Sequence, residues 1–168
     1  MLSLVKIDSS NNIVPGAAAS WDISSDKCVY TFHLKSGLKW HVLDTTNEIM
    51  GTNFSGDLTA YDYAFGITRT LLPETKSPFA KDFYIIKNGE KVNSGELSKE
   101  KLGIETPDSL TVKITLEKPS DEFLYLMATS AAMPCNEDFF NDTKGSYGLD
   151  VDFYLYCGAF YLSHWHRA

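Results

Sequence analysis

The stretch that decides the fold is Cys28-Val29-Tyr30-Thr31-Phe32-His33-Leu34-Lys35. Side chains alternate along it, and it is rich in the β-branched and aromatic residues that favour a pleated, half-buried strand. Successive residues of a strand point to opposite faces, so Tyr30, Phe32 and Leu34 share one face. We therefore predict a strand here, with these three side chains in the core.

Two further alternating segments lie at 102–106 and 110–116, separated by Pro107-Asp108-Ser109. A short polar connection between two such segments is typical of a β-hairpin. Shorter strands are predicted at 2–7 and at the end of the chain, over 159–166. The buried face of the hairpin is predicted to carry Leu110, Val112, Ile114 and Leu116.

The clearest helix signal begins at Thr59, a good N-cap, with Asp62 three residues later near the positive end of the helix dipole. The helix should run from Ala60 to about Leu72, where Pro73 stops it. Shorter helical segments are predicted over 83–92, 121–129 and 137–143, and a loop over 42–57. The order of strands, helices, hairpin, helices and strand indicates an α+β fold. We expect a mixed or antiparallel sheet with short helices packed on it, in one domain that spans residues 1–168.

Composition excludes several function classes. The 168 residues carry a net charge of −7 and include only two arginines, Arg69 and Arg167, so we predict no nucleic-acid partner. No apolar run approaches the roughly 18 residues that would span a bilayer. Cys28, Cys135 and Cys157 are widely spaced, which favours buried thiols over a metal cage and leaves one disulfide as the alternative.

No catalytic motif is found, and no cofactor is predicted. Gly145-Ser146-Tyr147-Gly148 lacks the spacing of a nucleophile elbow, and no phosphate-binding glycine loop occurs. His164 and His166 flank Trp165, so on a strand both imidazoles would share a face and could reach one metal ion. A small extracellular hydrolase or metal-binding domain using this pair stays open as the alternative function. Without any function, His164 and His166 would simply lie at the solvent-exposed end of a strand.

Several blocks in order resemble the family 5 solute-binding proteins of ABC importers, the oligopeptide- and dipeptide-binding group. The motifs of that family are P-G-x-A-x-S-W, Y-T-F-x-L-R-x-G-x-K-W-x-D-G, V-T-A-x-D-F/V, D-P-x-T-x-S-P-Y-A, L-G-V-x-x-x-D-x-x-T-L-x-V-T-L-x-x-P and N-G-A/P-Y-x-L. The similar stretches here are Ile13 to Trp21, Tyr30 to His41, Leu58 to Tyr63, Leu72 to Ala80, Leu102 to Ile104 with Leu110 to Pro119, and Gly158 to Leu162. This chain departs from the family pattern in the long 42–57 segment, in Cys157 before the last block and in Phe79, where relatives carry tyrosine.

The resemblance implies a partial first lobe, namely its inserted subdomain, of a larger two-lobed protein with a periplasmic-binding-protein-like fold. It also implies capture of oligopeptides outside the cytoplasmic membrane and their delivery to ABC permease and ATPase subunits. Membrane attachment is expected only through a lipid anchor that lies outside these residues, together with the signal peptide and the second lobe. Phe79 is the one position carried over as substrate-binding, and this chain alone is expected to bind ligand weakly or not at all.

Overall fold

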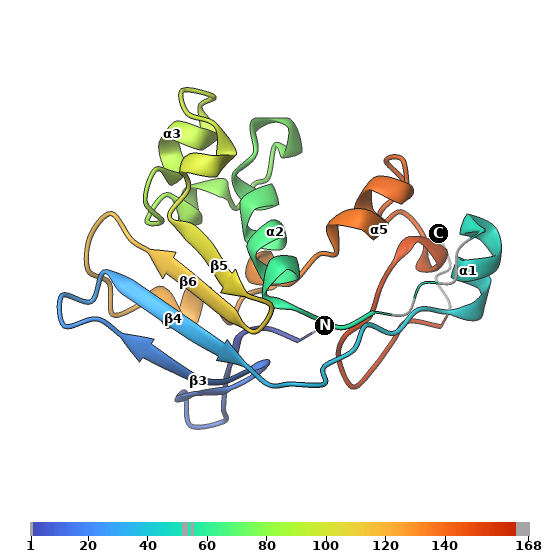
Figure 1. The fold of residues 1–168 in the computed structure, drawn as a ribbon, viewed down its shortest axis with the longest axis horizontal. Helices are drawn as coiled ribbons and strands as arrows, with labels where there is room; N and C mark the ends of the chain where they lie inside the picture. Colours follow the sequence, from blue (N-terminus) through green and yellow to red (C-terminus); the bar gives the residue numbers. More distant parts are fainter. Residues whose placement is uncertain (1, 52–53, 55, 164–168) are drawn as a thin grey trace.

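The computed structural model describes residues 2–51, 54 and 56–163. Its centre is a four-stranded antiparallel sheet in the order β3-β4-β6-β5 (Figure 1). A separate two-stranded ribbon pairs β1 with β2. The strand bounds are β1 Val5–Ile7, β2 Ile13–Pro15, β3 Ala18–Ile23, β4 Val29–Leu34, β5 Ile104–Asp108 and β6 Thr111–Thr115.

The alternation predicted for β4 is confirmed. Tyr30, Phe32 and Leu34 are buried, and Phe32 has no exposed surface. Phe32 lies opposite Val112 and Tyr30 opposite Ile114 in the β4–β6 register, so the two strands bury the same face. Cross-strand pairs of this kind stabilise a sheet more than the propensity of either strand alone.

The hairpin between β5 and β6 is also confirmed, with one correction. Leu110 is 38% exposed, although it continues the apolar alternation of β6. It lies in the turn, where its backbone N–H donates to Asp108 Oδ1 at 2.8 Å. The periodicity of a strand does not extend into a turn, so Leu110 does not follow the buried side chains of β6.

Helix α2 runs from Ala60 to Leu71 and packs against β5 and β6. Asp62 Oδ2 accepts from the backbone N–H of Thr59 at 2.7 Å, as a capping box requires. Tyr63, Ile67 and Leu71 recur at helical spacing and are fully buried. The predicted helix is therefore confirmed. It ends at Leu71, and after Leu72 the chain enters a 3₁₀ turn at Pro73.

The other helices are short: α1 Asp44–Met50, α3 Gly89–Asn93, α4 Phe123–Leu126 and α5 Glu137–Asp142. Helix α1 contradicts the predicted loop over 42–57. Its apolar periodicity is too weak to be read from the sequence, and it forms against the 3₁₀ turn Val151–Phe153 instead. The predicted segment 83–92 is helical only at its two ends, in the last residue of the 3₁₀ turn Ala80–Phe83 and in α3 from Gly89. The segment 121–129 is helical only in α4.

Two sequence predictions about strands were incomplete or wrong. β3 covers a segment in which no strand was predicted, because Ile23 is its one β-branched residue. Residues 159–163 contain no strand, and the remainder of the predicted last strand lies outside the described residues. Tyr156 instead makes an isolated antiparallel bridge with His41.

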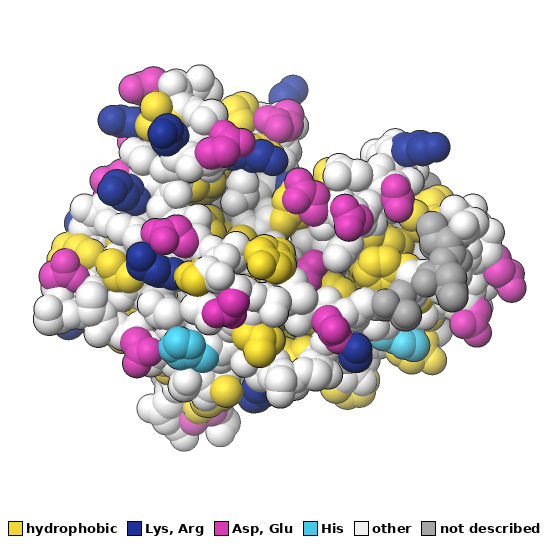
Figure 2. Space-filling model, in the orientation of Figure 1, with side chains coloured by type: hydrophobic (Ala, Val, Ile, Leu, Met, Phe, Trp, Pro, Cys, Tyr) yellow, Lys and Arg dark blue, Asp and Glu magenta, His cyan; other side chains and the backbone are white. Residues whose placement is uncertain are grey.

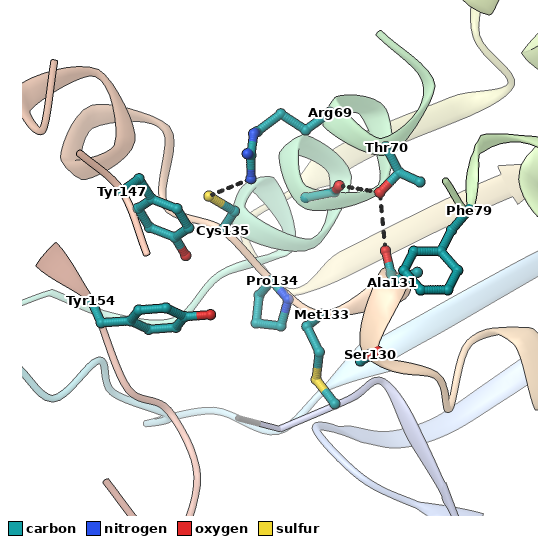
Figure 3. Close-up of a pocket in the computed structure, with 11 residues that line it drawn as sticks. Arg69, Thr70, Phe79, Ser130, Ala131, Met133, Pro134, Cys135, Tyr147 and Tyr154 are labelled. Atoms are coloured by element: carbon teal, nitrogen blue, oxygen red, sulfur yellow. Dashed lines mark hydrogen bonds between the residues drawn. The ribbon is translucent and has the colours of Figure 1, made fainter. Parts of the chain in front are cut away.

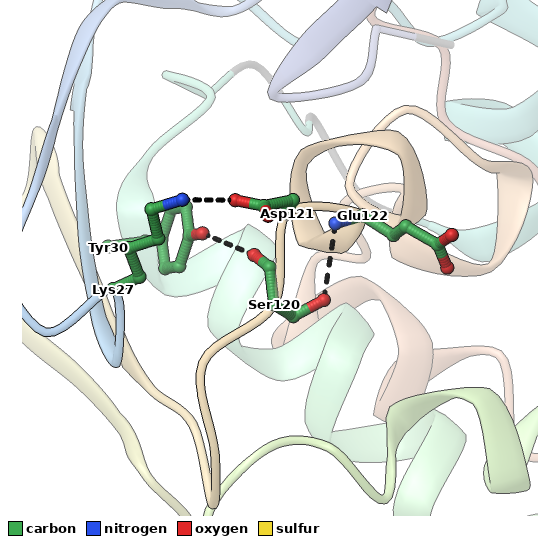
Figure 4. A network of polar contacts seen from close by, with 5 residues as sticks. All are labelled: Lys27, Tyr30, Ser120, Asp121 and Glu122. Carbon is green, nitrogen blue, oxygen red and sulfur yellow. Dashed lines mark hydrogen bonds and ion pairs between the residues drawn. The ribbon is translucent and has the colours of Figure 1, made fainter.

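A polar network fastens α4 to the turn between β3 and β4 (Figure 4). Tyr30 donates its phenol O–H to the Ser120 carbonyl oxygen at 2.6 Å, and its ring lies 4.8 Å from that of Phe123. Lys27 Nζ lies 2.6 Å from Asp121 Oδ1, but both of these side chains are largely exposed. Exposed ion pairs contribute little, so the Tyr30 contacts carry the attachment of α4.

The three cysteines are free thiols, as the sequence favoured, and Cys135 is buried. Burial raises the pKa of the Cys135 and Cys157 thiols, so both stay protonated near neutral pH. Among the described residues, no helix combines the length and apolar character needed to cross a bilayer.

Candidate functional site

A cleft with a volume of about 370 Å³ opens between α2, the segment 130–135 and two tyrosines near the C-terminal end of the described chain (Figure 3). This volume lies within the usual range for small-molecule sites. Figure 2 shows a notch in the outline of the whole molecule. It separates the part that contains the sheet, α2 and α3 from the smaller part that contains α1 and α5. The cleft is lined by Gly66, Arg69, Thr70, Phe79, Ser130, Ala131, Met133, Pro134, Cys135, Tyr147 and Tyr154.

Phe79 forms the apolar end of the cleft. It follows Pro78 and caps the 3₁₀ turn Ala80–Phe83, where its backbone N–H donates to Ser77 Oγ at 3.2 Å. The side chain is 49% exposed, so its ring is accessible to a molecule that enters the cleft. The structure thus places the one sequence-predicted site residue in the wall of a cleft, and its contact with ligand stays a prediction.

Three other aromatic residues, Trp40, Phe83 and Tyr84, are packing residues. Phe83 is fully buried and Trp40 is 5% exposed. Tyr84 is half-buried and donates its phenol O–H to Asn93 Oδ1 at 2.7 Å. None of the three lines the cleft.

The floor of the cleft is a close contact between α2 and the segment 131–135. Gly66 is at the crossing, because a Cβ there would overlap the Met133 carbonyl oxygen and approach the Cys135 nitrogen to 3.1 Å. Thr70 Oγ1 donates to the Ala131 carbonyl oxygen at 3.1 Å, and the Cys135 N–H donates to the Asp62 carbonyl oxygen at 2.9 Å. The segment 131–135 is therefore held in close contact with α2.

Two stacked tyrosines form the opposite wall. The rings of Tyr147 and Tyr154 lie 5.4 Å apart at 27°. Burial raises the pKa of the Tyr147 phenol far above its ordinary value, so this hydroxyl is neutral and can both donate and accept a hydrogen bond. The stack continues through Tyr156, whose ring lies 5.7 Å from that of Tyr154.

Arg69 supplies the positive charge of the cleft. Its guanidinium lies 4.3 Å from the centre of the Phe140 ring and 5.5 Å from that of Tyr147, within cation–π distance of both. Nη1 lies 3.8 Å from Cys135 Sγ, and the buried Nε has no hydrogen-bond partner in the described part of the chain. Arg69 could not be assigned to a site from the sequence, because a basic residue in the last turn of a helix is explained by the helix dipole.

These groups can bind a ligand, and no nucleophile is paired with a base among the described residues that line the cleft. The Thr70 hydroxyl donates to main-chain carbonyls, and the Cys135 thiol has no histidine beside it among the cleft residues. His33 lies 2.8 Å from Asp22, and the His41 ring lies 5.2 Å from that of Tyr161. Within the described part of the chain, no group of histidine, cysteine and carboxylate side chains could hold a metal ion. His164 and His166 lie outside the described residues.

Comparison with known proteins agrees with the order of motifs in the sequence. Residues 12–168 match the model of the bacterial extracellular solute-binding proteins, family 5 Middle. The chain is 30% identical over 166 residues to the dipeptide-binding protein DppE of Bacillus subtilis, covering 98% of this chain and 28% of that protein. It is also 30% identical to the probable deoxycholate-binding periplasmic protein YgiS of Escherichia coli, over 96% of this chain and 28% of that protein.

Among solved structures, the substrate-binding domain of an oligopeptide ABC transporter from Bacillus anthracis superposes with a TM-score of 0.89 at 35% identity. The superposition covers 99% of this chain and 30% of that one. The chain therefore belongs to family 5 of the bacterial extracellular solute-binding proteins, and the α+β fold expected from the sequence is confirmed. It spans less than a third of the length of these relatives.

Proposed function

We propose that residues 1–168 form one domain, part of the first lobe of a solute-binding protein that captures oligopeptides outside the cytoplasmic membrane. The observation that carries the proposal is the cleft with Phe79 in its wall, at a position that the family resemblance nominated independently. An exposed phenylalanine, two stacked tyrosines and main-chain groups of 130–135 suit a ligand recognised by shape and backbone rather than by one side chain.

The captured peptide passes, in this proposal, to the permease and ATPase subunits of an ABC importer, and a lipid anchor outside these residues holds the protein at the membrane. Closure of two lobes over the ligand would bury it and create the surface that docks on the permease. This chain supplies one wall of such a site. On its own it should bind peptides weakly, because a ligand that is covered on one side loses most of the burial that stabilises a complex.

The test is calorimetric titration of the longest natural polypeptide that contains residues 1–168, with the 168-residue chain in parallel. The ligands are a pool of di- to pentapeptides and, separately, deoxycholate. Heat with peptides from the long polypeptide, and little from the chain, is the expected result. Heat with deoxycholate alone would assign a bile acid as the solute, and tight peptide binding by the chain would contradict the requirement for a second lobe.

A matched pair of variants tests the cleft itself. Phe79→Ala removes the exposed aromatic wall and should weaken peptide binding by roughly 10-fold, the usual effect of truncating an aromatic contact. Tyr61→Ala is the control, since Tyr61 is similarly exposed, at 54%, but lies outside the cleft. Equal affinities for the two variants would remove Phe79 from the site.

A further inference from the structure

We propose that Arg69 is a carboxylate-binding residue, and that the ligand of this cleft is held at one end by an ionised carboxylate. The inference rests on the proposed function and adds a chemical requirement on the ligand. It assigns a role to the charge of a residue that the sequence motifs do not single out.

The first observation is that the positive charge of Arg69 has no carboxylate partner among the described residues. Their ion pairs are Lys27–Asp121, His33–Asp22, Lys39–Asp57, Lys99–Glu137 and Lys113–Glu105, and none of them includes Arg69. This is notable in a chain with a net charge of −7, where carboxylates outnumber cations. A guanidinium that lines a cleft and is partly desolvated usually has an anionic partner.

The nearby carboxylate on the same helix is already used. Asp62 precedes Arg69 by two helical turns. Its Oδ2 accepts from Thr59, and its Oδ1 accepts from the Asn136 Nδ2 amide at 2.9 Å. Both oxygens therefore accept hydrogen bonds at the starts of α2 and α5, and neither forms an ion pair with Arg69.

The second observation concerns the donors of the guanidinium. A guanidinium has five N–H groups, and among the described residues Nη1 has one acceptor, a thiol sulfur at 3.8 Å, which accepts weakly. Nε is buried and therefore closed to a ligand. Cation–π packing explains the position above Phe140 but gives the terminal nitrogens Nη1 and Nη2 no strong acceptor, and a carboxylate can accept from two such N–H groups side by side.

The surroundings hold the guanidinium in place for such a contact. The Phe140 and Tyr147 rings lie close to it, and the Tyr147 ring also lines the cleft that Arg69 lines. Figure 3 shows the guanidinium, the Cys135 sulfur and the Tyr147 ring grouped at the end of the cleft opposite Phe79. A ligand with an apolar group toward Phe79 and a carboxylate toward Arg69 matches both ends.

In a peptide this carboxylate is either the C-terminal group or an aspartate or glutamate side chain, and two ligand pairs separate these sources. Ala-Phe-Ala as the free acid is compared with its C-terminal amide. Ala-Glu-Ala amide is compared with Ala-Gln-Ala amide. Each is titrated calorimetrically into the longest natural polypeptide that contains residues 1–168.

The expected result is that the charged member of one pair binds roughly 10- to 100-fold more tightly than its neutral partner, as loss of a charge-assisted hydrogen bond predicts. In Arg69→Met this preference should disappear, and in Arg69→Lys, which keeps the charge without the planar fork, it should be reduced. Lys99→Met is the matched control, because Lys99 is a cation paired with Glu137 outside the cleft. It should leave the preference unchanged.

The ligand pairs need no variant, so the inference can be tested even if Arg69→Met does not fold. Equal affinities within both pairs would overturn the role of Arg69 while leaving peptide capture intact. A charge preference that survives in Arg69→Lys and Arg69→Met alike would also overturn it. Failure of all four peptides to bind would overturn the proposed function, and the inference with it.

Discussion

The sheet and the aromatic C-terminal part of the chain are built in different ways. In the sheet block, which comprises β3, β4, β5, β6 and α2, backbone ladders set the geometry and alternating apolar side chains fill the space between sheet and helix. In the tyrosine stack, which comprises Tyr147, Tyr154, Tyr156 and Tyr161, neighbouring ring centres lie 5.4, 5.7 and 6.2 Å apart with little regular secondary structure around them.

The difference matters because the cleft lies where the two regions meet. Its floor and its cation come from α2, and one wall comes from Tyr147 and Tyr154. The sheet block is held by hydrogen bonds between strands and by a core, whereas the stack depends on ring contacts worth about 1 kcal/mol each. We therefore expect the sheet block to persist when the stack is disturbed, but not the reverse.

The largest expected effect follows from Phe32→Ala. Phe32 has no exposed surface, so removing its ring leaves a cavity at the centre of the sheet block and should lower the free energy of unfolding by roughly 3–5 kcal/mol. Phe160→Ala is the control for the same substitution at an exposed position, since Phe160 is 87% exposed. Urea denaturation followed by circular dichroism measures both, and equal losses would mean that Phe32 does not support the core of the sheet block.

Gly66→Ala should weaken the contact between α2 and the segment 131–135, which forms the floor of the cleft. The added methyl group overlaps the Met133 carbonyl oxygen, which outweighs the gain of about 1 kcal/mol in helix propensity. We expect a net loss of roughly 1–3 kcal/mol in the free energy of unfolding. Hydrogen exchange should also rise at the Cys135 amide, which donates to Asp62.

Thr68→Ala on the same helix is the control, because Thr68 lies away from the segment 131–135. It should leave exchange at Cys135 unchanged. A stabilised Gly66→Ala protein would mean that α2 and the segment 131–135 do not need this close contact.

Tyr154→Leu tests the stack alone. Tyr154 lies between Tyr147 and Tyr156, so the substitution removes two ring contacts and should cost roughly 1–2 kcal/mol. The loss should be local: hydrogen exchange should increase over residues 147–156 and remain unchanged at the Phe32 and Val112 amides of the sheet. Uniform acceleration across the sheet would show that the two regions unfold as one unit.

The smallest expected effect is a pH dependence from Asp62. Burial raises the pKa of this carboxyl above its ordinary value of 3.8, against hydrogen bonds from Thr59 and Asn136 that lower it. The folded protein therefore binds the proton more tightly than the unfolded chain does. The contribution of Asp62 to stability is accordingly greatest below the ordinary pKa and falls as the pH rises through the raised one.

The measurement is the difference in unfolding free energy between the wild type and Asp62→Asn from pH 3 to 6. Subtraction removes the opposing effect of carboxyls such as Asp8 and Asp26, whose pKa values are lowered by hydrogen bonds to neighbouring side chains and backbone. The difference should shift against the wild type as the pH rises. A shift in its favour would mean that the hydrogen bonds of Asp62 outweigh its burial.

Parts of the fold and of the site could be read from the sequence. The strand with Phe32, the hairpin and the capped helix that starts after Thr59 carry strong local signals, and the structure confirms all three. Phe79 could be nominated only because an ordered set of blocks resembled a family. Arg69 carried no signal, because nothing local distinguishes an arginine that stabilises a helix end from one that lines a cleft.

By itself the sequence determined the elements whose causes are local, since alternation, capping and turn chemistry act over a few residues. The tertiary structure alone decided which of these elements meet. It decided that α1 forms against Val151–Phe153, that Leu110 turns outward and that His41 pairs with Tyr156. It also brought Arg69, Cys135 and Tyr147 together, residues that are far apart along the chain. Such contacts depend on the packing of surfaces that exist only once the chain has folded, so no short stretch of sequence encodes them.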